Sequence, residues 1–313
     1  MTGFTTTNGT NLIRSDVWGQ ELKDILEDEL QGMGYVRWLT TFPDGDTFHI
    51  PSIGQATVYD YAENQPIRYE AMDTGEFTFE ITEYVHSGTY ITRKMMQDSF
   101  YTSELVSQFV PRQSRAIMEK LETDIFGLQS QQVASNANVI NGADHRFVAT
   151  GANEIMAPAD FAKAKYGLKK ANVPMTNLVA IVDPAVGYQL ETLTNLVNVS
   201  NNPRWEGVIE SGMTTGMRFI KNVYGFDVYE SNYLADIASE TIGGDTVTNG
   251  KANLFFSAAG DVLPFIGAWR QAPEVDEEYN KDFQRYEYVT TARYGVKLYR
   301  PENLVTVLSA PTV

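Results

Sequence analysis

The residue types that most often carry catalysis or bind metals are sparse in this sequence and do not occur at catalytic spacing. Histidine occurs only as His49, His86 and His145, which lie far apart along the chain. An isolated histidine is more often a strand or loop residue than a base or a metal ligand. Cysteine is absent, which excludes disulfides and thiolate metal sites and suits a reducing cytoplasm.

Two segments imitate ligand-binding loops but lack their key residues. Residues 244–251 (GDTVTNGK) look like a phosphate-binding loop, yet the two glycines are one residue too far apart and Ala252 replaces the required Ser or Thr. We interpret residues 242–250 as a turn-rich surface loop. Asp44 and Asp46 lack the continuation of a calcium loop. Dinucleotide, serine-hydrolase and zinc-peptidase motifs are also absent, so the sequence predicts no catalytic residue, no metal site and no cofactor.

Composition excludes further classes of protein. The net charge of −16 opposes direct binding to nucleic acid, which needs clustered Lys and Arg. The 4 Trp, 17 Tyr and 16 Phe have few basic residues among them, which favours packing in cores and protein interfaces over base stacking. The most hydrophobic late stretch, residues 254–269, is interrupted by Asp261 and Pro264 and is too short to span a bilayer.

A long amphipathic helix is predicted between residues 102 and 129. Pro111 lies within the pattern and is expected to kink or divide the helix near Val110, leaving a short lead-in and a longer piece over residues 112–129. We interpret this helix as a structural spine with an apolar stripe at the 3.6-residue period. The stripe consists of Leu105, Phe109, Ile117, Leu121, Ile125 and Leu128, with Ile117, Leu121 and Ile125 as its central residues.

A strand-rich arm precedes this helix. Residues 47–61 and 76–90 are rich in Thr, Val, Ile, Tyr and Phe, which predicts two antiparallel strands. A strand of ~15 residues is ~50 Å long, whereas a compact domain of this size has a radius of gyration near ~20 Å. The polar connection over residues 62–75 is therefore expected to reach a neighbouring copy. The residues alone leave open an ordinary hairpin folded onto its own sheet. The expected contact residues are Glu63, Asn64, Gln65, Pro66, Ile67, Arg68 and Tyr69.

Shorter patterns fill the rest of the chain. Helices are predicted over residues 15–33 and 158–171, and a buried strand over 178–182 is followed by a turn and another helix. The polar residues 130–151 predict a domain boundary. Further expected features are a loop at 198–216, strands at 225–234, 254–256, 286–292 and 296–299, and an acidic link at 276–278.

Four segments in this order resemble the major capsid proteins of tailed bacteriophages. The first is the loop over residues 42–83, joined to the spine helix through ITRKMMQDSFYTSELVSQF. The second begins PADFAKAKYGLKKANVP and continues NLVAIVDPAVGYQLETL, and the third is GFDVYESNYL. The fourth comprises NLFFSAAGDVLPFIGAWRQAPEV and YEYVTTARYGVKLYRPENLVTVLSA. Pro111 departs from the family's uninterrupted spine.

This resemblance implies an α+β chain with the tailed-phage major capsid protein fold. The parts would be an N-terminal arm and helix, an extended two-stranded loop, a peripheral domain with the spine helix, and an axial α/β domain. Their expected ranges are 1–35 for the arm and helix, 44–83 for the loop, 36–43, 84–150 and 265–299 for the peripheral domain, and 151–264 and 300–313 for the axial domain.

The implied function is structural. Copies would assemble as hexamers and pentamers into an icosahedral head that encloses double-stranded DNA without binding it specifically. The implied partners are a scaffolding protein, a portal and decoration proteins, with assembly in the host cytoplasm and a final place in the virion. Two alternatives remain at this point: an encapsulin-like nanocompartment shell and, from another class, a soluble α/β enzyme.

Overall fold

The computed structural model describes residues 30–39, 47–53, 57–67, 69, 71, 74–98, 102–192, 219–260 and 262–311. The expected loop over residues 198–216 and most of the helix expected over 15–33 lie outside these ranges. Of that expected helix, Gly32 and Met33 belong to a short 3₁₀ turn, η1 (Gly32–Tyr35). None of the helices in the described part is long and apolar enough to cross a membrane.

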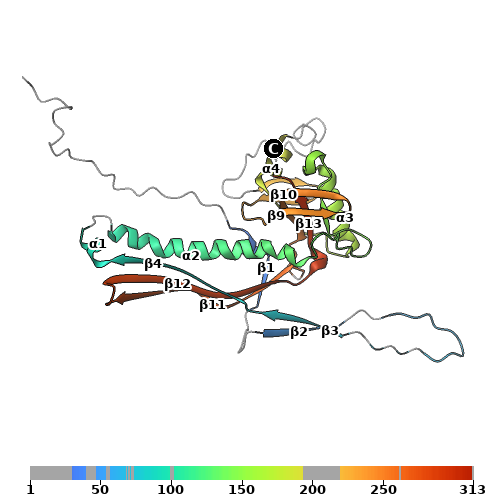
Figure 1. The fold of residues 1–313 in the computed structure, drawn as a ribbon. Coiled ribbons are helices and arrows are strands. Elements are labelled where there is room, and N and C mark those ends of the chain that lie inside the picture. Colours follow the sequence, from blue (N-terminus) through green and yellow to red (C-terminus); the bar gives the residue numbers. More distant parts are fainter. Residues whose placement is uncertain are drawn as a thin grey trace, which may run out of the picture.

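Two larger sheets and one small sheet organise the chain (Figure 1). The seven-stranded sheet has the order β5-β13-β10-β6-β8-β7, with β9 added beside β10. Its strands are β5 (Arg146–Val148), β6 (Leu178–Val182), β7 (Phe219–Val223), β8 (Phe226–Glu230), β9 (Asp236–Ile242), β10 (Asp245–Ser257) and β13 (Val305–Ser309). The four-stranded sheet, ordered β1-β11-β12-β4, contains β1 (Val36–Leu39), β4 (Glu83–Thr92), β11 (Phe265–Asn280) and β12 (Arg285–Leu298). β2 (Thr47–Ile53) and β3 (Thr74–Glu80) form a separate hairpin.

The seven-stranded sheet carries the main apolar core and the predicted α/β elements. The strand β6 and the helix α3 (Pro158–Lys170) confirm two predictions, and α4 (Pro184–Thr192) follows the expected turn. α3 begins at proline, which needs no backbone donor there, and the Asp160 carboxylate accepts the Ala157 N–H at 2.8 Å. The Phe161 ring meets the Phe255 ring edge to face at 5.1 Å, which fixes α3 on the sheet.

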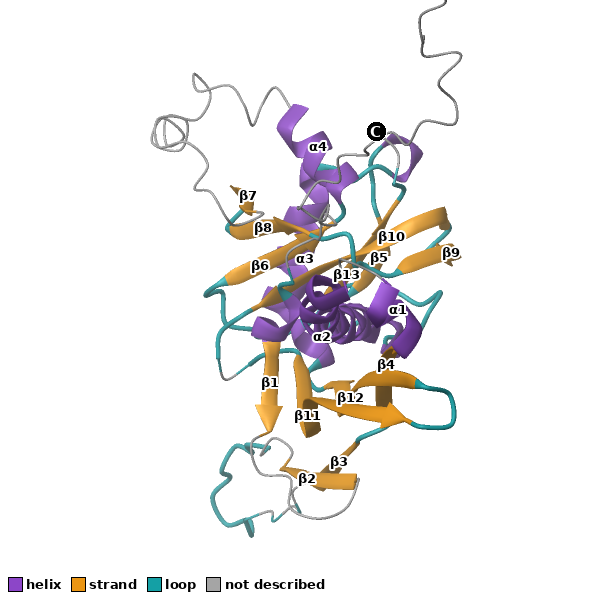
Figure 2. Cartoon of the chain, turned by 90° about the vertical axis from the view of Figure 1, so that its left-hand side faces the viewer, coloured by secondary structure: helices purple, strands orange, loops and turns teal. Residues whose placement is uncertain are grey.

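The spine helix α2 (Thr102–Gly127) lies along one face of the four-stranded sheet (Figures 1 and 2). The short α1 (Arg93–Asp98) precedes it, and the 3₁₀ turn η2 (Leu128–Gln131) follows it. Buried polar contacts hold α2 to β12. Thr290 donates to the Gln113 amide oxygen at 2.9 Å, and the Tyr294 hydroxyl donates to Asp124 at 2.7 Å.

Of the expected kink or division at Pro111, the division is wrong, because α2 is continuous through that residue. Proline removes the single N–H that would bond to the carbonyl four residues earlier. The other backbone hydrogen bonds remain available, and the part of α2 after Pro111 packs on β4 and β12. These contacts outweigh one lost hydrogen bond, so the helix does not end there.

The expected pair of 15-residue strands is also wrong. β2 and β3 are seven residues each and pair from Thr47 with Glu80 to Ile53 with Thr74. The second predicted run splits after Glu80, and its later part becomes β4, which pairs with β12 instead. β4 has a partner more than 190 residues away in sequence, which local patterns do not reveal.

Two further expectations change with the strand pairing. The expected surface loop over residues 242–250 is a β-hairpin in which β9 turns at Gly243 and Gly244 into β10. Both glycines have positive φ, as a tight hairpin turn requires. The expected acidic link at 276–278 lies within β11, paired residue by residue with β12. In addition, β5 lies in the expected peripheral range 84–150 yet pairs with β13 in the seven-stranded sheet.

Candidate assembly surfaces

The connection between β2 and β3 is the most exposed apolar part of the described chain. It projects away from both larger sheets (Figure 1). Val58 is 91% exposed and Tyr69 is 90% exposed, and the side chains of Tyr61 and Ile67 are also largely in solvent. Because soluble surfaces rarely gather large apolar side chains, a cluster of this kind is typical of a contact surface.

The structure places most of the expected contact residues on this connection. Arg68 lies outside the described residues. The backbone turns near Asn64, which has a positive φ of 67°, and the Gln65 N–H donates to the Ala62 carbonyl at 3.3 Å. The other expected residues, Glu63, Asn64, Gln65, Pro66, Ile67 and Tyr69, are all exposed.

The base of the hairpin, unlike its tip, is firmly packed. Phe79 and Ile81 are buried against Ile266 and Ala268 of β11. The Lys297 ammonium group donates to the Thr78 carbonyl at 2.7 Å. The hairpin therefore leaves the body from a fixed origin.

Close backbone packing at this base requires a glycine in β12. A Cβ on Gly295 would lie 2.6 Å from the Glu80 carbonyl oxygen and 2.9 Å from the Ile81 Cα. Such distances are shorter than non-bonded contacts permit, and both neighbours are backbone atoms that cannot rotate away. Gly295 therefore lets β3 cross over β12.

A second exposed apolar surface lies at the far end of the four-stranded sheet, where the β11–β12 turn meets the start of α1. The Arg93 N–H donates to the Gln284 carbonyl at 2.9 Å and joins the two segments. The Arg285 guanidinium lies 4.5 Å from the Tyr90 ring centroid and 4.7 Å from that of Phe283. We call this the distal patch; its exposed apolar side chains are Tyr90, Met95, Met96 and Phe283.

Sequence reasoning missed the distal patch because it interpreted residues 276–278 as a link. The available signal was the pair of tyrosines that flank the turn. Tyr279 lies opposite Tyr286 in the hairpin, with ring centroids 4.8 Å apart. Aromatic residues at equal distances from a short polar segment are typical of cross-strand pairs.

The predicted central residues of the spine helix lie in the interior. Ile117, Leu121 and Ile125 are buried, and Leu121 and Ile125 pack in a core that also includes Phe256 and Phe265. This core joins strands of both larger sheets to α2. The helix thus connects the two larger sheets as well as covering one of them.

Gln31 and Gly32, at the start of the described residues, are bonded to this helix. The Glu122 carboxylate accepts N–H bonds from Gln31 at 2.9 Å and from Gly32 at 2.7 and 2.8 Å. A Cβ on Gly32 would lie 2.7 Å from a Glu122 oxygen, so glycine permits the close approach. The bond network satisfies a carboxylate that is otherwise buried.

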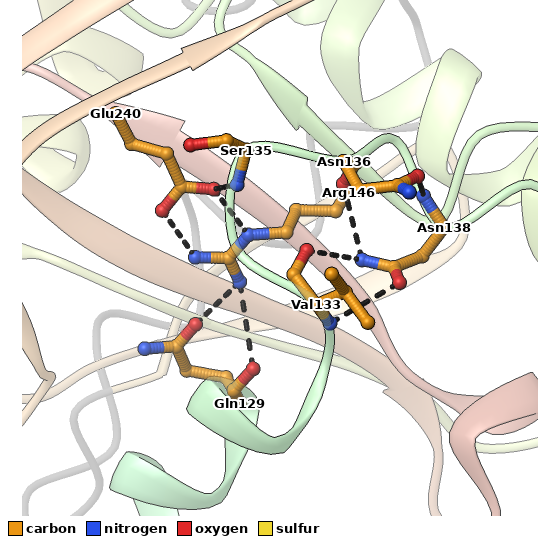
Figure 3. A network of polar contacts seen from close by, with 7 residues as sticks. All are labelled: Gln129, Val133, Ser135, Asn136, Asn138, Arg146 and Glu240. Carbon is orange, nitrogen blue, oxygen red and sulfur yellow. Dashed lines mark hydrogen bonds and ion pairs between the residues drawn. The ribbon is translucent and has the colours of Figure 1, made fainter.

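A buried ion pair joins the end of the spine helix to the seven-stranded sheet (Figure 3). Arg146 on β5 forms two bonds of 2.7 Å to the Glu240 carboxylate on β9, and its third nitrogen donates to the Gln129 side chain of η2. The Ser135 N–H also donates to Glu240, at 2.8 Å. Burial raises the pKa of Glu240, but the hydrogen bonds from Arg146 and Ser135 outweigh it and lower the pKa overall.

The histidines do not come together. His49 lies on β2 beside Glu76, His86 lies on β4, and His145 is buried next to β5. Burial lowers the pKa of His145, which favours the neutral ring. Within the described ranges, no group of three or more His, Cys, Asp or Glu side chains is arranged to hold a metal ion.

Comparison with known proteins decides the family. A family model described as phage capsid protein matches residues 56–307, which is well over half of the chain. The chain belongs to this family. The protein is a structural major capsid protein of a tailed phage, not an enzyme, and its place is the capsid of the virion. Membership in a capsid family implies association with further copies of itself into a shell.

Solved phage structures share the fold of this capsid protein at low sequence identity. A chain from the capsid structure of cyanophage P-SCSP1u has a TM-score of 0.73 and 16% identity, with 99% of this chain and 98% of that chain covered. A chain from the capsid asymmetric unit of cyanophage Pam1 has a TM-score of 0.71 and 15% identity, with 100% of each chain covered. A chain from Mycobacterium phage Che8 gives 0.69 and 16%, with coverage of 95% and 97%. No curated protein sequence matches the chain.

Proposed function

We propose that this capsid protein assembles as hexamers and pentamers into an icosahedral head, and that the β2–β3 connection is an inter-subunit contact. The observation that carries this proposal is the exposure of Val58, Tyr61, Ile67 and Tyr69 on one projecting segment. Identical subunits that meet head to tail form closed rings when the rotation closes. A segment that projects from one side of each copy suits such a contact.

The division of the chain follows from the sheets and is part of the proposal. The four-stranded sheet with α2 would be the peripheral domain, and the seven-stranded sheet the axial domain. β5 belongs with the axial domain because it pairs with β13. The pairing of β5 with β13 supports a boundary before Arg146 in place of the one expected at residue 150.

The distal patch is a second contact surface under this proposal. It lies at the opposite end of the four-stranded sheet from the axial domain (Figure 1). Contacts made by the β2–β3 connection would join copies within a ring, and the distal patch would join neighbouring rings. A closed shell built from rings needs contacts between rings in addition to the contacts within each ring.

The enclosed material would be double-stranded DNA, held without specific binding. The net charge of −16 supports a wall that does not grip phosphate. A scaffolding protein, a portal and decoration proteins are the proposed partners, and the host cytoplasm is the proposed place of assembly. An encapsulin-like shell would instead hold a cargo enzyme, so nuclease-protected DNA in native particles separates the two.

Mutation of the connection tests the contact. We expect Ile67→Ser with Tyr69→Ser to leave the subunit folded while reducing the yield of closed particles at least tenfold. The matched control is Tyr188→Ser, which removes an exposed tyrosine from α4. Circular dichroism reports folding, and mass photometry with electron microscopy reports assembly. Normal particle yield from the double variant would refute a role for this connection.

A further inference from the structure

The distal patch has a basic side. Residues 93–98 of α1 and residues 281–285 of the β11–β12 turn together carry four basic and two acidic side chains. Arg93, Lys94 and Lys281 are exposed, and none of the three has an ion-pair partner within the described residues. A backbone hydrogen bond joins the start of α1 to the turn. The basic groups are therefore held next to the exposed rings and methionines of the patch.

The same end of the four-stranded sheet has an acidic strand edge. β11 pairs with β1 only over Phe265–Ala268, so its regular stretch over residues 274–280 has no strand on that side among the described residues. We call residues 274–280 the acidic edge. It contains no basic residue, and its exposed acidic side chains are Glu274, Asp276, Glu277 and Glu278. Unpaired backbone groups make such an edge a place where another chain can bind.

Both sets of charges are unfavourable in an isolated subunit. Glu278 lies directly opposite Glu287 of β12, and like charges in this position destabilise a pair of strands. Arg285 offsets part of this repulsion through its 2.6 Å bond to Glu287. Arg93 and Lys94 occupy the first turn of α1, where the helix dipole favours acidic residues. The stability of the subunit explains neither placement, whereas a surface of opposite sign on another copy would offset both.

A single copy does not bring the two surfaces together. β12 lies between β11 and β4, so the acidic edge is two strand spacings, ~10 Å, from the strand that leads into α1. None of the four carboxylates of the edge has an ion-pair partner in the described part of the chain. The charges on both surfaces are therefore available to a neighbour.

The sign of the charge selects the surface that the acidic edge can meet. Two acidic edges repel each other, which opposes the edge-to-edge pairing that unpaired strands otherwise favour. The basic side of the distal patch attracts the edge, and its exposed Met95 and Met96 can pack on the exposed Val275 of the edge.

We propose that the distal patch of one copy binds the acidic edge of a second copy. The inference rests on the proposed function, in which the distal patch joins neighbouring rings, and it names the surface that the patch meets. Charge complementarity would then fix which surfaces of two rings come together, because every other pairing of these two surfaces places like charges side by side.

Carbodiimide crosslinking of assembled shells tests the pairing without any substitution. The reagent joins a lysine amine to a carboxylate without a spacer, so that only groups in contact react. Shells are assembled from equal amounts of isotopically labelled and unlabelled chains, crosslinked and digested with trypsin. We expect Lys94 to be joined to Asp276 or Glu278, with labelled and unlabelled peptides combined at random. Products whose two peptides always carry the same label would place the contact within one copy and overturn the proposal.

Charge reversal tests whether the sign of the charge decides the contact. Arg93→Glu with Lys94→Glu reverses the basic side, and Asp276→Lys with Glu278→Lys reverses the acidic edge. Each double variant is expected to lower the yield of closed shells at least about tenfold while separate rings persist, because like charges then face each other. A chain with all four substitutions restores opposite signs and should recover most of the natural yield.

The control and the readouts distinguish failure of this inference from failure of the proposed function. Lys169→Glu with Lys170→Glu changes two exposed lysines of α3 and should leave assembly normal. Mass photometry and electron microscopy count rings and shells, and circular dichroism reports folding. Natural shells beside a fourfold variant that assembles no better than either double variant would rule out the pairing alone, as would normal shells from a double variant. A natural chain that forms neither rings nor shells would overturn both.

Discussion

The Arg146–Glu240 pair offers the sharpest test of how the spine helix is joined to the axial sheet. Arg146 is 1% exposed and Glu240 is 6% exposed, and two bonds of 2.7 Å join them. Removing one member of a buried pair leaves an uncompensated charge and costs about 3–5 kcal/mol. We therefore expect Glu240→Leu and Arg146→Met each to destabilise the unassembled subunit by that amount.

The double variant distinguishes the free-energy cost of an unpaired buried charge from the net contribution of the ion pair to stability. Arg146→Met with Glu240→Leu removes both charges and fills the space with apolar groups, which is often nearly neutral. Ser135 loses its bond to Glu240, but its segment is exposed and water can replace that bond. Gln129 is buried, so the loss of its bond from Arg146 is the main remaining cost. The double variant should therefore cost about 2 kcal/mol or less, below either single variant.

Urea denaturation of unassembled subunits, followed by circular dichroism, measures these differences. At about 3 kcal/mol per molar urea, a loss of 3–5 kcal/mol lowers the midpoint by about 1–1.7 M. Single variants that cost less than about 1 kcal/mol would refute a buried, desolvated pair. A double variant as unstable as the two single variants added together would show that the charges act independently.

The pair also predicts a pH dependence. The folded-state pKa of Glu240 is lowered, so its contribution is fully present above the pKa of an unfolded glutamate, near ~4.3, and is lost as pH falls through the folded value. The stability difference between the natural chain and Glu240→Leu should therefore narrow below about pH 4.3. A difference that stays constant down to pH 2 would contradict this linkage.

Three further predictions follow from single contacts and from net charge. Gly295→Ala should lower the free energy of unfolding by about 1–3 kcal/mol, because its Cβ would meet the backbone of Glu80. The control Gly34→Ala, with open space around it, should change the free energy of unfolding little. Urea denaturation measures both. Tyr294→Phe should cost about 1.5 kcal/mol through loss of the 2.7 Å bond to Asp124, with the exposed Tyr166→Phe as the control. Shell assembly, measured by light scattering, should be slower at 0.01 M than at 0.1 M salt. The reason is that the Debye length grows from ~10 to ~30 Å on this dilution and copies of charge −16 repel one another over a longer range. Equal rates of assembly would contradict a repulsive barrier.

The sequence alone was sufficient to predict those helices and strands that depend on the pattern of consecutive residues. The apolar stripe through Ile117, Leu121 and Ile125 predicted a helix, and the start of α3 at Pro158 followed from the position that proline prefers. The apolar run of β6 predicted a buried strand. The absence of catalytic motifs and the order of the segments also favoured a shell protein over an enzyme.

Tertiary structure decided which strand pairs with which, and therefore where the contact surfaces lie. β4 pairs with β12 and not with β2, and the acidic residues 276–278 form a strand because β12 lies beside them. Likewise, Pro111 stays inside α2 because the helix is packed along the four-stranded sheet. These outcomes depend on contacts between residues far apart in sequence. Periodicity and turn signals report only the local preference of the backbone, so the distal patch became visible only in the folded chain.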